Sequence, residues 1–298
     1  MLGYYLIKIV SRFVCVAPAW VSKSLGSLLG NLALIFAPAW RKKMAAANIR
    51  ECLGVSGTDA ACIADASLYR FGRMAVEFLR FPLLKPTNLD EFVEFEGLEN
   101  LREAAAKDRG VIIATAHFGN WELLGAAISL LGYDMLSIAR KQNNGSMDRF
   151  VNEYRQSVGQ KIAYNRGRHG LMAISRALRE KKFLGILYDQ DTNDDGVCLK
   201  LFGKDSVIPL GSAAFSRLYG TPVVPAFIHN REDGKSVVKV YPALYAGCSE
   251  DKNADCVAVT EKLAAILEEE ISSDPSMWFW VHDRWKDGRR RFKNNQEG

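Results

Sequence analysis

The first 50 residues of the chain contain no aspartate or glutamate, although they contain seven lysines and arginines. Residues 51–280 carry a small excess of acidic over basic side chains. A basic, apolar N-terminus on a mildly acidic body indicates contact with an anionic surface at one end, because each Lys or Arg close to anionic headgroups contributes about 1 kcal/mol. Nucleic-acid-binding proteins more often spread basic groups over the folded domain, so we expect no nucleic-acid partner.

The chain also lacks the cysteine and serine motifs of several enzyme classes. Its six cysteines form no C-x-x-C pair and do not cluster with the four histidines. In a chain of 298 residues this pattern favours scattered reduced thiols over a disulfide framework or a zinc site. No G-x-S-x-G elbow occurs, which excludes the serine hydrolases built on that turn.

The N-terminus has no uninterrupted apolar run of the roughly 20 residues that a spanning helix needs. Residues 2–22 are interrupted by two basic side chains, and residues 24–40 are uncharged but shorter than that length. Trp20 and Trp40, the latter followed by three basic residues, occupy positions typical of a membrane interface. We predict that residues 1–45 anchor the protein to a membrane, as a spanning helix or as helices in the headgroup region. The alternative is a buried helical hairpin of a soluble protein.

The rest of the chain alternates short apolar strands with helices. This alternation predicts an α/β fold: one catalytic domain over residues 46–298, with a largely parallel central sheet flanked by helices. A helix capped by Thr58 and Asp59 is expected to run to about residue 79. The predicted strands are 111–115, 134–138, 183–187, 223–228 and 237–241. The predicted helices that follow are 98–106, 121–131, 147–158, 170–181, 212–218 and 255–271.

The clearest candidate for chemistry follows the first of these strands. In parallel sheets reactive groups gather beyond the carboxyl ends of the strands, and His117 leaves the strand at that end. Gly119 lets the backbone turn, and Glu122 lies in the first turn of the next helix, where its carboxylate can reach back to the imidazole. A free imidazole, with a pKa of about 6.5, is a suitable general base, and a carboxylate on its other nitrogen fixes the tautomer. The alternative is that His117 caps the helix and Glu122 complements its dipole.

Four motifs in order give the chain a family resemblance. The string HFGNWE at 117–122 resembles the first motif of the bacterial lipid A acyltransferases of the lauroyl/myristoyl type, within the glycerolipid acyltransferase superfamily. Residues 187–191 (LYDQD) resemble that family's D-Q/H-D segment, and residues 220–227 (GTPVVPAF) its G-x-P-V-V-P-x-F strand. Residues 278–286 (WFWVHDRWK) resemble its closing W-V-H-x-R-[FW]-K motif.

The resemblance implies an O-acyltransferase without a cofactor. His117 would be the general base and Glu122 its orienting partner, with direct transfer of a fatty acyl group and no acyl-enzyme. The donor would be a thioester of acyl carrier protein or coenzyme A. The acceptor would be a hydroxyl of a lipid A precursor or similar glycolipid, at the cytoplasmic face of the inner membrane.

The resemblance also implies which residues contact the substrates. Arg140 and Arg155 match basic residues that can hold acceptor phosphates or a developing oxyanion. Asn120, Asp189 and Gln190 are further expected substrate-binding or substrate-shaping positions.

Acidic residues in the segment 189–195 could hold Mg²⁺ or Ca²⁺. Turn formation by residues 192–196 explains them without a metal, and we predict no metal site.

Two other function classes remain open from the sequence. A thioesterase would use His117 to activate water in place of a lipid hydroxyl. A noncatalytic lipid-binding protein would keep the fold without the chemistry. The relatively polar, Gly-containing stretch 191–209 differs from the aromatic-rich segment of many lipid A enzymes, which leaves the identity of the acceptor open.

Overall fold

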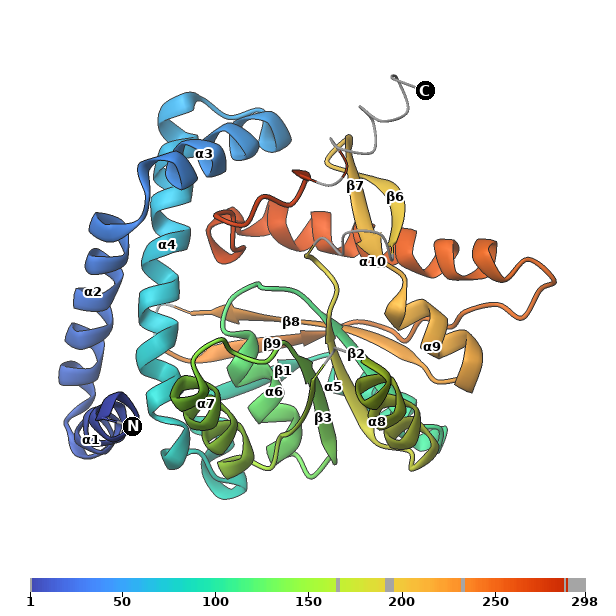
Figure 1. The fold of residues 1–298 in the computed structure, drawn as a ribbon, viewed down its shortest axis with the longest axis horizontal. Coiled ribbons are helices and arrows are strands. Elements are labelled where there is room, and N and C mark those ends of the chain that lie inside the picture. The colour runs from blue at the N-terminus through green and yellow to red at the C-terminus, as the bar shows by residue number, and fades with distance from the viewer. Residues whose placement is uncertain (1, 165–166, 191–195, 232–233, 287, 289–298) are drawn as a thin grey trace.

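A computed structural model describes residues 2–164, 167–190, 196–231, 234–286 and 288. At its centre these residues form a seven-stranded sheet with the order β1-β9-β8-β2-β5-β3-β4 (Figure 1). Neighbouring strands are parallel except for β8 and β9, which pair antiparallel. The strands are β1 Val93–Glu96, β2 Val111–Thr115, β3 Met135–Ala139, β4 Lys161–Tyr164, β5 Phe183–Leu187, β8 Val223–Asn230 and β9 Ser236–Val240.

Helices cover both faces of this sheet. α5, α6 and α7 pack on one face, and α8, α9 and α10 pack on the other together with α3 and α4. The hairpin of β6 (Gly196–Leu201) and β7 (Lys204–Pro209) forms a separate two-stranded sheet. The helices are α1 Leu2–Val16, α2 Ala19–Phe36, α3 Ala39–Leu53, α4 Gly57–Leu79, α5 Leu98–Ala106, α6 Trp121–Leu130, α7 Gly145–Ser157, α8 Gly167–Arg179, α9 Gly211–Tyr219 and α10 Lys252–Ser273, with short 3₁₀ turns at Phe81–Leu83, Pro86–Glu91 and Pro275–Met277.

The central strands are apolar on both sides because both faces of the sheet are covered. Every residue of β2 is buried; Ile112 and Ala114 face one core, and Val111 and Ile113 face the other. Side chains alternate across a strand, so a nearly continuous apolar run is what a doubly covered parallel sheet requires. The predicted fold class is confirmed.

The predicted elements differ from the structure mainly where strands are short or half-polar. The strands at 111–115 and 183–187 and the helix at 98–106 have their predicted bounds, and the others shift by a few residues. Strands β1 and β4 and the β6–β7 hairpin were not predicted; β1, β4 and β6 carry exposed side chains and lack the continuous apolar run of the central strands. The helix at 57–79 is capped by Ser56, which accepts a hydrogen bond from the Asp59 N–H, so the predicted cap at Thr58 and Asp59 is wrong.

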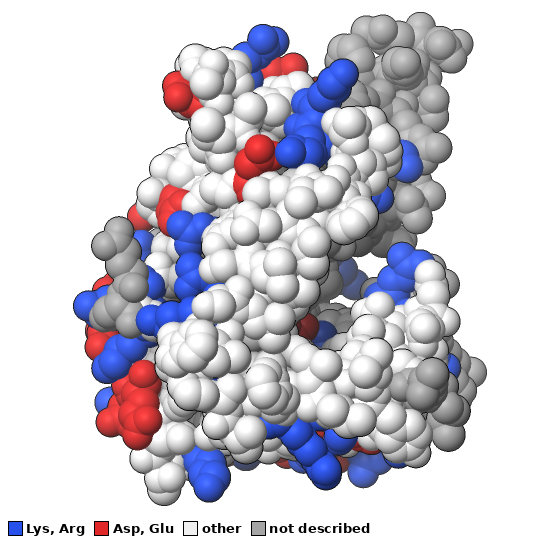
Figure 2. Space-filling model, turned by 90° about the vertical axis from the view of Figure 1, so that its left-hand side faces the viewer, with Lys and Arg blue, Asp and Glu red and all other residues white. Residues whose placement is uncertain are grey.

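The first four helices form a layer along one side of the molecule (Figure 1), and the outer surface of this layer is largely uncharged (Figure 2). α2 lies directly against α4: a Cβ atom added to Gly72 would be 2.4 Å from the backbone nitrogen of Gly30. Within the described ranges α2 is the one helix long and apolar enough to cross a membrane, and only 17% of it is buried. α3 runs through residue 45, so the predicted domain boundary falls inside a helix.

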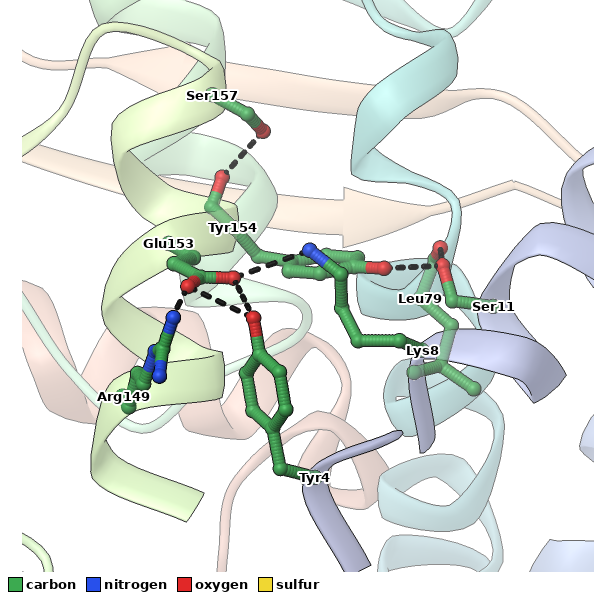
Figure 3. Close-up of polar contacts among 8 residues, drawn as sticks. All are labelled: Tyr4, Lys8, Ser11, Leu79, Arg149, Glu153, Tyr154 and Ser157. Atoms are coloured by element: carbon green, nitrogen blue, oxygen red, sulfur yellow. Dashed lines mark hydrogen bonds and ion pairs between the residues drawn. The ribbon is translucent and has the colours of Figure 1, made fainter. Parts of the chain in front are cut away.

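A polar cluster ties α1 to α7 (Figure 3). The Glu153 carboxylate accepts hydrogen bonds from Tyr4 Oη (2.6 and 2.8 Å) and Lys8 Nζ (3.0 Å) of α1, and from Arg149 Nε (3.1 Å) of its own helix. Nearby, Tyr154 Oη donates to Ser11 Oγ at 2.5 Å. The hydrogen bond from Tyr4 is the main reason that the pKa of Glu153 is lowered to about 2, and hydrogen bonds from Lys8 and Arg149 add to this effect. Burial acts in the opposite direction but is the weaker influence.

We predict that Glu153→Gln loosens α1. The pKa of Glu153 in the folded protein lies below its unfolded value of about 4.3. The ionised carboxylate therefore contributes its full stabilisation above about pH 4.3, and this stabilisation is lost as the pH falls through about 2. Hydrogen exchange of the α1 amides should be faster in the variant at pH 7, and the difference should shrink below about pH 4.

Glu180→Gln is the matched control. The pKa of Glu180 is also lowered to about 2, by hydrogen bonds from Lys182 and Arg176, and its partners lie on and just beyond α8. This variant should leave exchange in α1 unchanged. Equal exchange of α1 in the wild type and in Glu153→Gln would contradict the prediction.

Candidate active site

Two neighbouring strands bring the site together at their carboxyl ends. β2 and β5 are parallel, with Thr115 opposite Leu187. His117 and Asp189 each lie two residues beyond this pair, so the register that aligns the strands also sets the two side chains face to face.

The Asp189 carboxylate is held by three donors. His117 Nδ1 lies 2.8 Å from Asp189 Oδ1, while the His117 backbone N–H (3.0 Å) and Trp278 Nε1 (2.9 Å) donate to Oδ2. Asp189 is 2% exposed. Burial alone would raise the pKa of Asp189, but the neighbouring imidazole and these hydrogen bonds lower it to about 2. The carboxylate is therefore ionised at pH 7 and favours the tautomer with a proton on Nδ1.

The second imidazole nitrogen faces Gln190. Its side-chain amide nitrogen lies 3.2 Å from His117 Nε2. With the proton on Nδ1, Nε2 carries the lone pair, and the Gln190 amide donates to it. The edge of Trp121 packs against the ring, with 4.8 Å between centroids. His117 thus has one nitrogen fixed by a carboxylate and one basic nitrogen with a neutral, exchangeable partner.

Glu122 does not occupy the expected position against the imidazole. Its carboxylate accepts hydrogen bonds from Arg155 Nε (2.8 Å) and from an Arg155 terminal nitrogen. The prediction that Glu122 orients His117 is therefore corrected: Asp189 from the neighbouring strand takes that place. The physical reason is that Glu122 lies on α6, where it meets the guanidinium from α7, whereas the strand register delivers Asp189 directly to Nδ1.

The loop between β2 and α6 is fixed by close packing. Gly119 has φ of 56°, and a Cβ atom there would lie 1.9 Å from the Ile228 carbonyl oxygen, so only glycine fits. Asn120 caps α6 by accepting from the Leu123 N–H (3.0 Å), and its amide donates to Glu77 of α4 (2.8 Å). Asn120 is 1% exposed, so its amide serves the loop and α4.

Backbone hydrogen bonds from the closing segment, residues 277–279, hold this loop in place. The Gly119 N–H donates to the Met277 carbonyl (2.9 Å), and the Phe279 N–H donates to the His117 carbonyl (3.1 Å). In the same segment, the Trp278 indole donates a hydrogen bond to Asp189. The sequence carries no sign that a tryptophan of this segment binds the buried carboxylate.

His117 lies between two hollows. The first, here called the strand-end groove, has a volume of about 530 Å³ and runs over the ends of β2, β5 and β3. Its lining includes five predicted site residues: His117, Glu122, Arg140, Arg155 and Gln190.

The second hollow, here called the α4 pocket, lies on the other side of the imidazole and has a volume of about 30 Å³. Its lining includes Asn120 and Trp121 and, from α4, Phe71, Arg73 and Glu77. The imidazole can therefore reach groups that approach from two directions.

The described residues contain no group of three or more His, Cys, Asp or Glu that could hold a metal ion. Asp191, Asp194 and Asp195, which belong to the acidic segment considered for a metal, lie outside the described residues.

Comparison with known proteins decides the family. The family model for bacterial lipid A biosynthesis acyltransferases matches residues 1–287. The chain belongs to this family. It is accordingly an O-acyltransferase, as the sequence motifs predicted.

Individual relatives are similar at modest identity. A phosphatidylinositol mannoside acyltransferase of Mycobacterium tuberculosis is 27% identical over 248 residues, covering 80% of this chain and 75% of the relative. The lipid A biosynthesis palmitoleoyltransferase of Escherichia coli is 24% identical over 265 residues, covering 88% and 84%. The lipid A biosynthesis lauroyltransferase of Escherichia coli is 24% identical over 212 residues, covering 70% and 64%.

The Glu122–Arg155 pair of this acyltransferase makes a testable prediction. The two side chains are 12% and 14% exposed, and removing one partner of a buried pair costs about 3–5 kcal/mol, because the other charge is left unpaired. Glu122→Gln and Arg155→Gln should each lower the free energy of unfolding in urea, and the double variant should lose much less than their sum.

The exposed pair of Arg176 and Glu180, whose side chains are 80% and 39% exposed, is the matched control. Its cycle should give a coupling of about 0.3–0.5 kcal/mol. An additive cycle at Glu122 and Arg155 would mean that these two side chains do not interact in the folded protein.

Proposed function

We propose that the protein transfers a fatty acyl group from a thioester to a hydroxyl of a glycolipid, with His117 as general base and Asp189 as its orienting carboxylate. The observation that carries this proposal is the hydrogen bond of 2.8 Å between His117 Nδ1 and a buried, ionised Asp189. An aliphatic hydroxyl is a poor nucleophile while it keeps its proton, so a positioned base is what the reaction needs.

The proton path follows from the tautomer. The acceptor hydroxyl replaces the Gln190 amide as the hydrogen-bond partner of Nε2 and gives its proton to this nitrogen as the oxygen attacks the thioester carbonyl. The C–O bond forms, the C–S bond breaks, and the thiolate recovers the proton from the imidazolium. Asp189 stabilises that imidazolium throughout, since the carboxylate is already desolvated and needs no reorganisation.

Direct transfer is favoured over a covalent intermediate. No cysteine lines either hollow beside His117 in the described part of the chain. Burial raises the pKa of Cys52 to about 12 and also raises the pKa of Cys15 and Cys256, which disfavours a reactive thiolate at these positions.

The donor and acceptor classes follow from the groove and from the relatives. Arg140 is exposed at the end of β3 and lines the strand-end groove. Its guanidinium suits the phosphate of a phosphopantetheine arm, which acyl carrier protein and coenzyme A share. We propose acyl carrier protein as the donor, with coenzyme A as the alternative. The relatives are named for lipid A and phosphatidylinositol mannosides, which supports a glycolipid acceptor.

We further propose that α1 and α2 lie in the headgroup region of the cytoplasmic face of the inner membrane. Their outward side chains include exposed apolar residues at Phe13 (58%), Trp20 (69%), Ile35 (72%) and Phe36 (76%). The close backbone contact of α2 with α4 favours a helix lying flat over one that leaves the domain to span the bilayer.

Asp189→Asn should lower kcat by a factor of about 10²–10⁴ because it removes the charge that steadies the imidazolium and disturbs the tautomer. His117→Ala should lower kcat at least as far. The assay follows ester formation from acyl-carrier-protein thioester and a glycolipid acceptor, with circular dichroism to check the fold.

Glu270→Gln is the control for this experiment. Glu270 is also a buried carboxylate on a histidine, 2.5 Å from His229 Nε2, and its pKa is also lowered to about 2, by hydrogen bonds from His229, Tyr241 and Lys239 that outweigh burial. Its loss should reduce stability and leave kcat near the wild-type value. Equal losses of kcat in both variants, or free fatty acid forming equally fast without acceptor, would contradict the proposed transfer.

Membrane docking is tested by replacing exposed apolar residues. Phe13→Ser with Ile35→Ser should weaken binding to lipid vesicles by at least about a hundredfold, since each buried side chain contributes roughly 1.5–3 kcal/mol. Leu171→Ser with Leu218→Ser removes residues of similar exposure, 59% and 69%, from α8 and α9 and should leave binding unchanged. Equal binding of the two double variants in a flotation assay would refute docking through α1 and α2.

A further inference from the structure

A third hollow lies between α2, α4 and the start of β9. This hollow, here called the α2 pocket, has a volume of about 110 Å³. Lys23 and Gly26 of α2 line one side, and Arg73, Glu77 and Arg80 of α4 line another. The pocket is separate from the strand-end groove and has no part in the proton path described above.

Among the described residues that line the α2 pocket, basic side chains outnumber acidic ones. Three of its lining side chains are cationic, and Glu77 is the one acid among the described lining residues. The Glu77 carboxylate accepts a hydrogen bond from Asn120. Within the described residues, no hydrogen bond or ion pair engages the side chains of Lys23, Arg73 or Arg80, and Arg80 Nε is buried without a partner.

Such an arrangement is unfavourable without an anion. Like charges that share a pocket repel one another, and a buried guanidinium N–H without an acceptor carries a desolvation penalty. A bound phosphate group would offset the repulsion between the cations and provide an acceptor for the unpaired N–H. Its oxygens accept from several donors at once, and arginine binds them in a bidentate manner.

The position of the pocket indicates where the phosphate comes from. α2 carries exposed apolar side chains, and Figure 2 shows Lys and Arg side chains along one border of that largely uncharged face, with Asp and Glu side chains beside them. Arg73 lines the α2 pocket and also the α4 pocket beside His117. A phosphate bound here would therefore lie at the membrane side and next to the hollow that opens on the imidazole.

We propose that Lys23, Arg73 and Arg80 form a phosphate-binding subsite for the headgroup of a phosphorylated lipid. This inference rests on the proposed function in one respect: the same headgroup belongs to the acceptor whose hydroxyl reaches His117. The shared chemistry is the phosphate, and free phosphate is the other source that the experiment must separate from a lipid headgroup.

The test uses the full-length protein and two double variants with the same change in charge. Lys23→Gln with Arg80→Gln alters the subsite, and Arg73 is left in place because it borders the α4 pocket. Arg102→Gln with Lys107→Gln is the control, since both residues are exposed on or next to α5 and neither is engaged in an ion pair. Lys23→Arg with Arg80→Lys retains the charges and should restore binding.

Binding is measured by flotation on phosphatidylcholine vesicles that contain phosphatidic acid, or oleate at the same surface charge. With phosphatidic acid the subsite variant should bind at least about thirtyfold more weakly than the control, because it loses the charge-assisted hydrogen bonds that two cations make with a phosphate group. With oleate the two variants should bind alike. Equal binding of both variants to phosphatidic acid, or an equal difference on oleate, would overturn the subsite.

A second arm separates the sources of phosphate and the two proposals. In acyl transfer, the subsite variant should show at least a tenfold higher KM for a phosphorylated glycolipid, with kcat and the KM of an unphosphorylated glycolipid unchanged. Inorganic phosphate, titrated by calorimetry, should bind the wild type far more weakly than the vesicles do. If inorganic phosphate binds tightly, only the subsite variant loses that binding, and flotation is unchanged, then the ligand of the subsite is free phosphate and not a lipid headgroup. Absence of transfer by the wild type would refute the proposed function alone, because flotation still tests the subsite.

Discussion

The structure of the site depends on one contact, the hydrogen bond between His117 and the buried carboxylate of Asp189. A desolvated carboxylate is tolerated only when several donors satisfy it, and here the imidazole, a backbone N–H and the Trp278 indole do so. Each donor has its own support. The closing segment that carries Trp278 is bonded to the loop after β2, and Ser67 of α4 donates to the Trp278 carbonyl at 2.5 Å. Residues of α4, the central sheet and the closing segment therefore all support the position of the Asp189 carboxylate.

This convergence explains what the sequence could and could not predict. The strand before His117 and the strand before Asp189 were predicted with their exact bounds, because both are continuous apolar runs that only a doubly covered strand requires. Their adjacency was not predictable from periodicity, since the order of strands in a sheet is a long-range property. A carboxylate five residues away in sequence, Glu122, therefore looked like the partner of the imidazole, and one 72 residues away proved to be. The tryptophan donor was hidden for the same reason: its partner lies 89 residues earlier in the chain.

Glu122 supports the wall of the strand-end groove instead of the imidazole. Its bidentate pair with Arg155 joins α6 to α7 in the wall of the strand-end groove. Two residues earlier on α7, Glu153 binds Tyr4 and Lys8 of α1 (Figure 3). One helix thus contacts both the N-terminal layer and the groove wall. The two ion-paired positions are two residues apart, less than one helical turn, so a shift of α7 at one contact also moves the other. Helix α1 is in this way part of the support of the site.

The two hollows beside His117 offer separate approaches to the two substrates of the proposed reaction. In the proposed transfer a thioester and a lipid hydroxyl meet at Nε2, and both substrates carry long apolar chains. The wide strand-end groove bears Arg140 at its rim, whereas the α4 pocket is narrow and adjoins the apolar N-terminal layer. In the proposed reaction the donor would occupy the first, whereas the second, with about 30 Å³, has room for a hydroxyl-sized group. The buried Asp189 contacts Nδ1 of the imidazole, so Nε2 is the nitrogen that can meet the substrates in the proposed reaction.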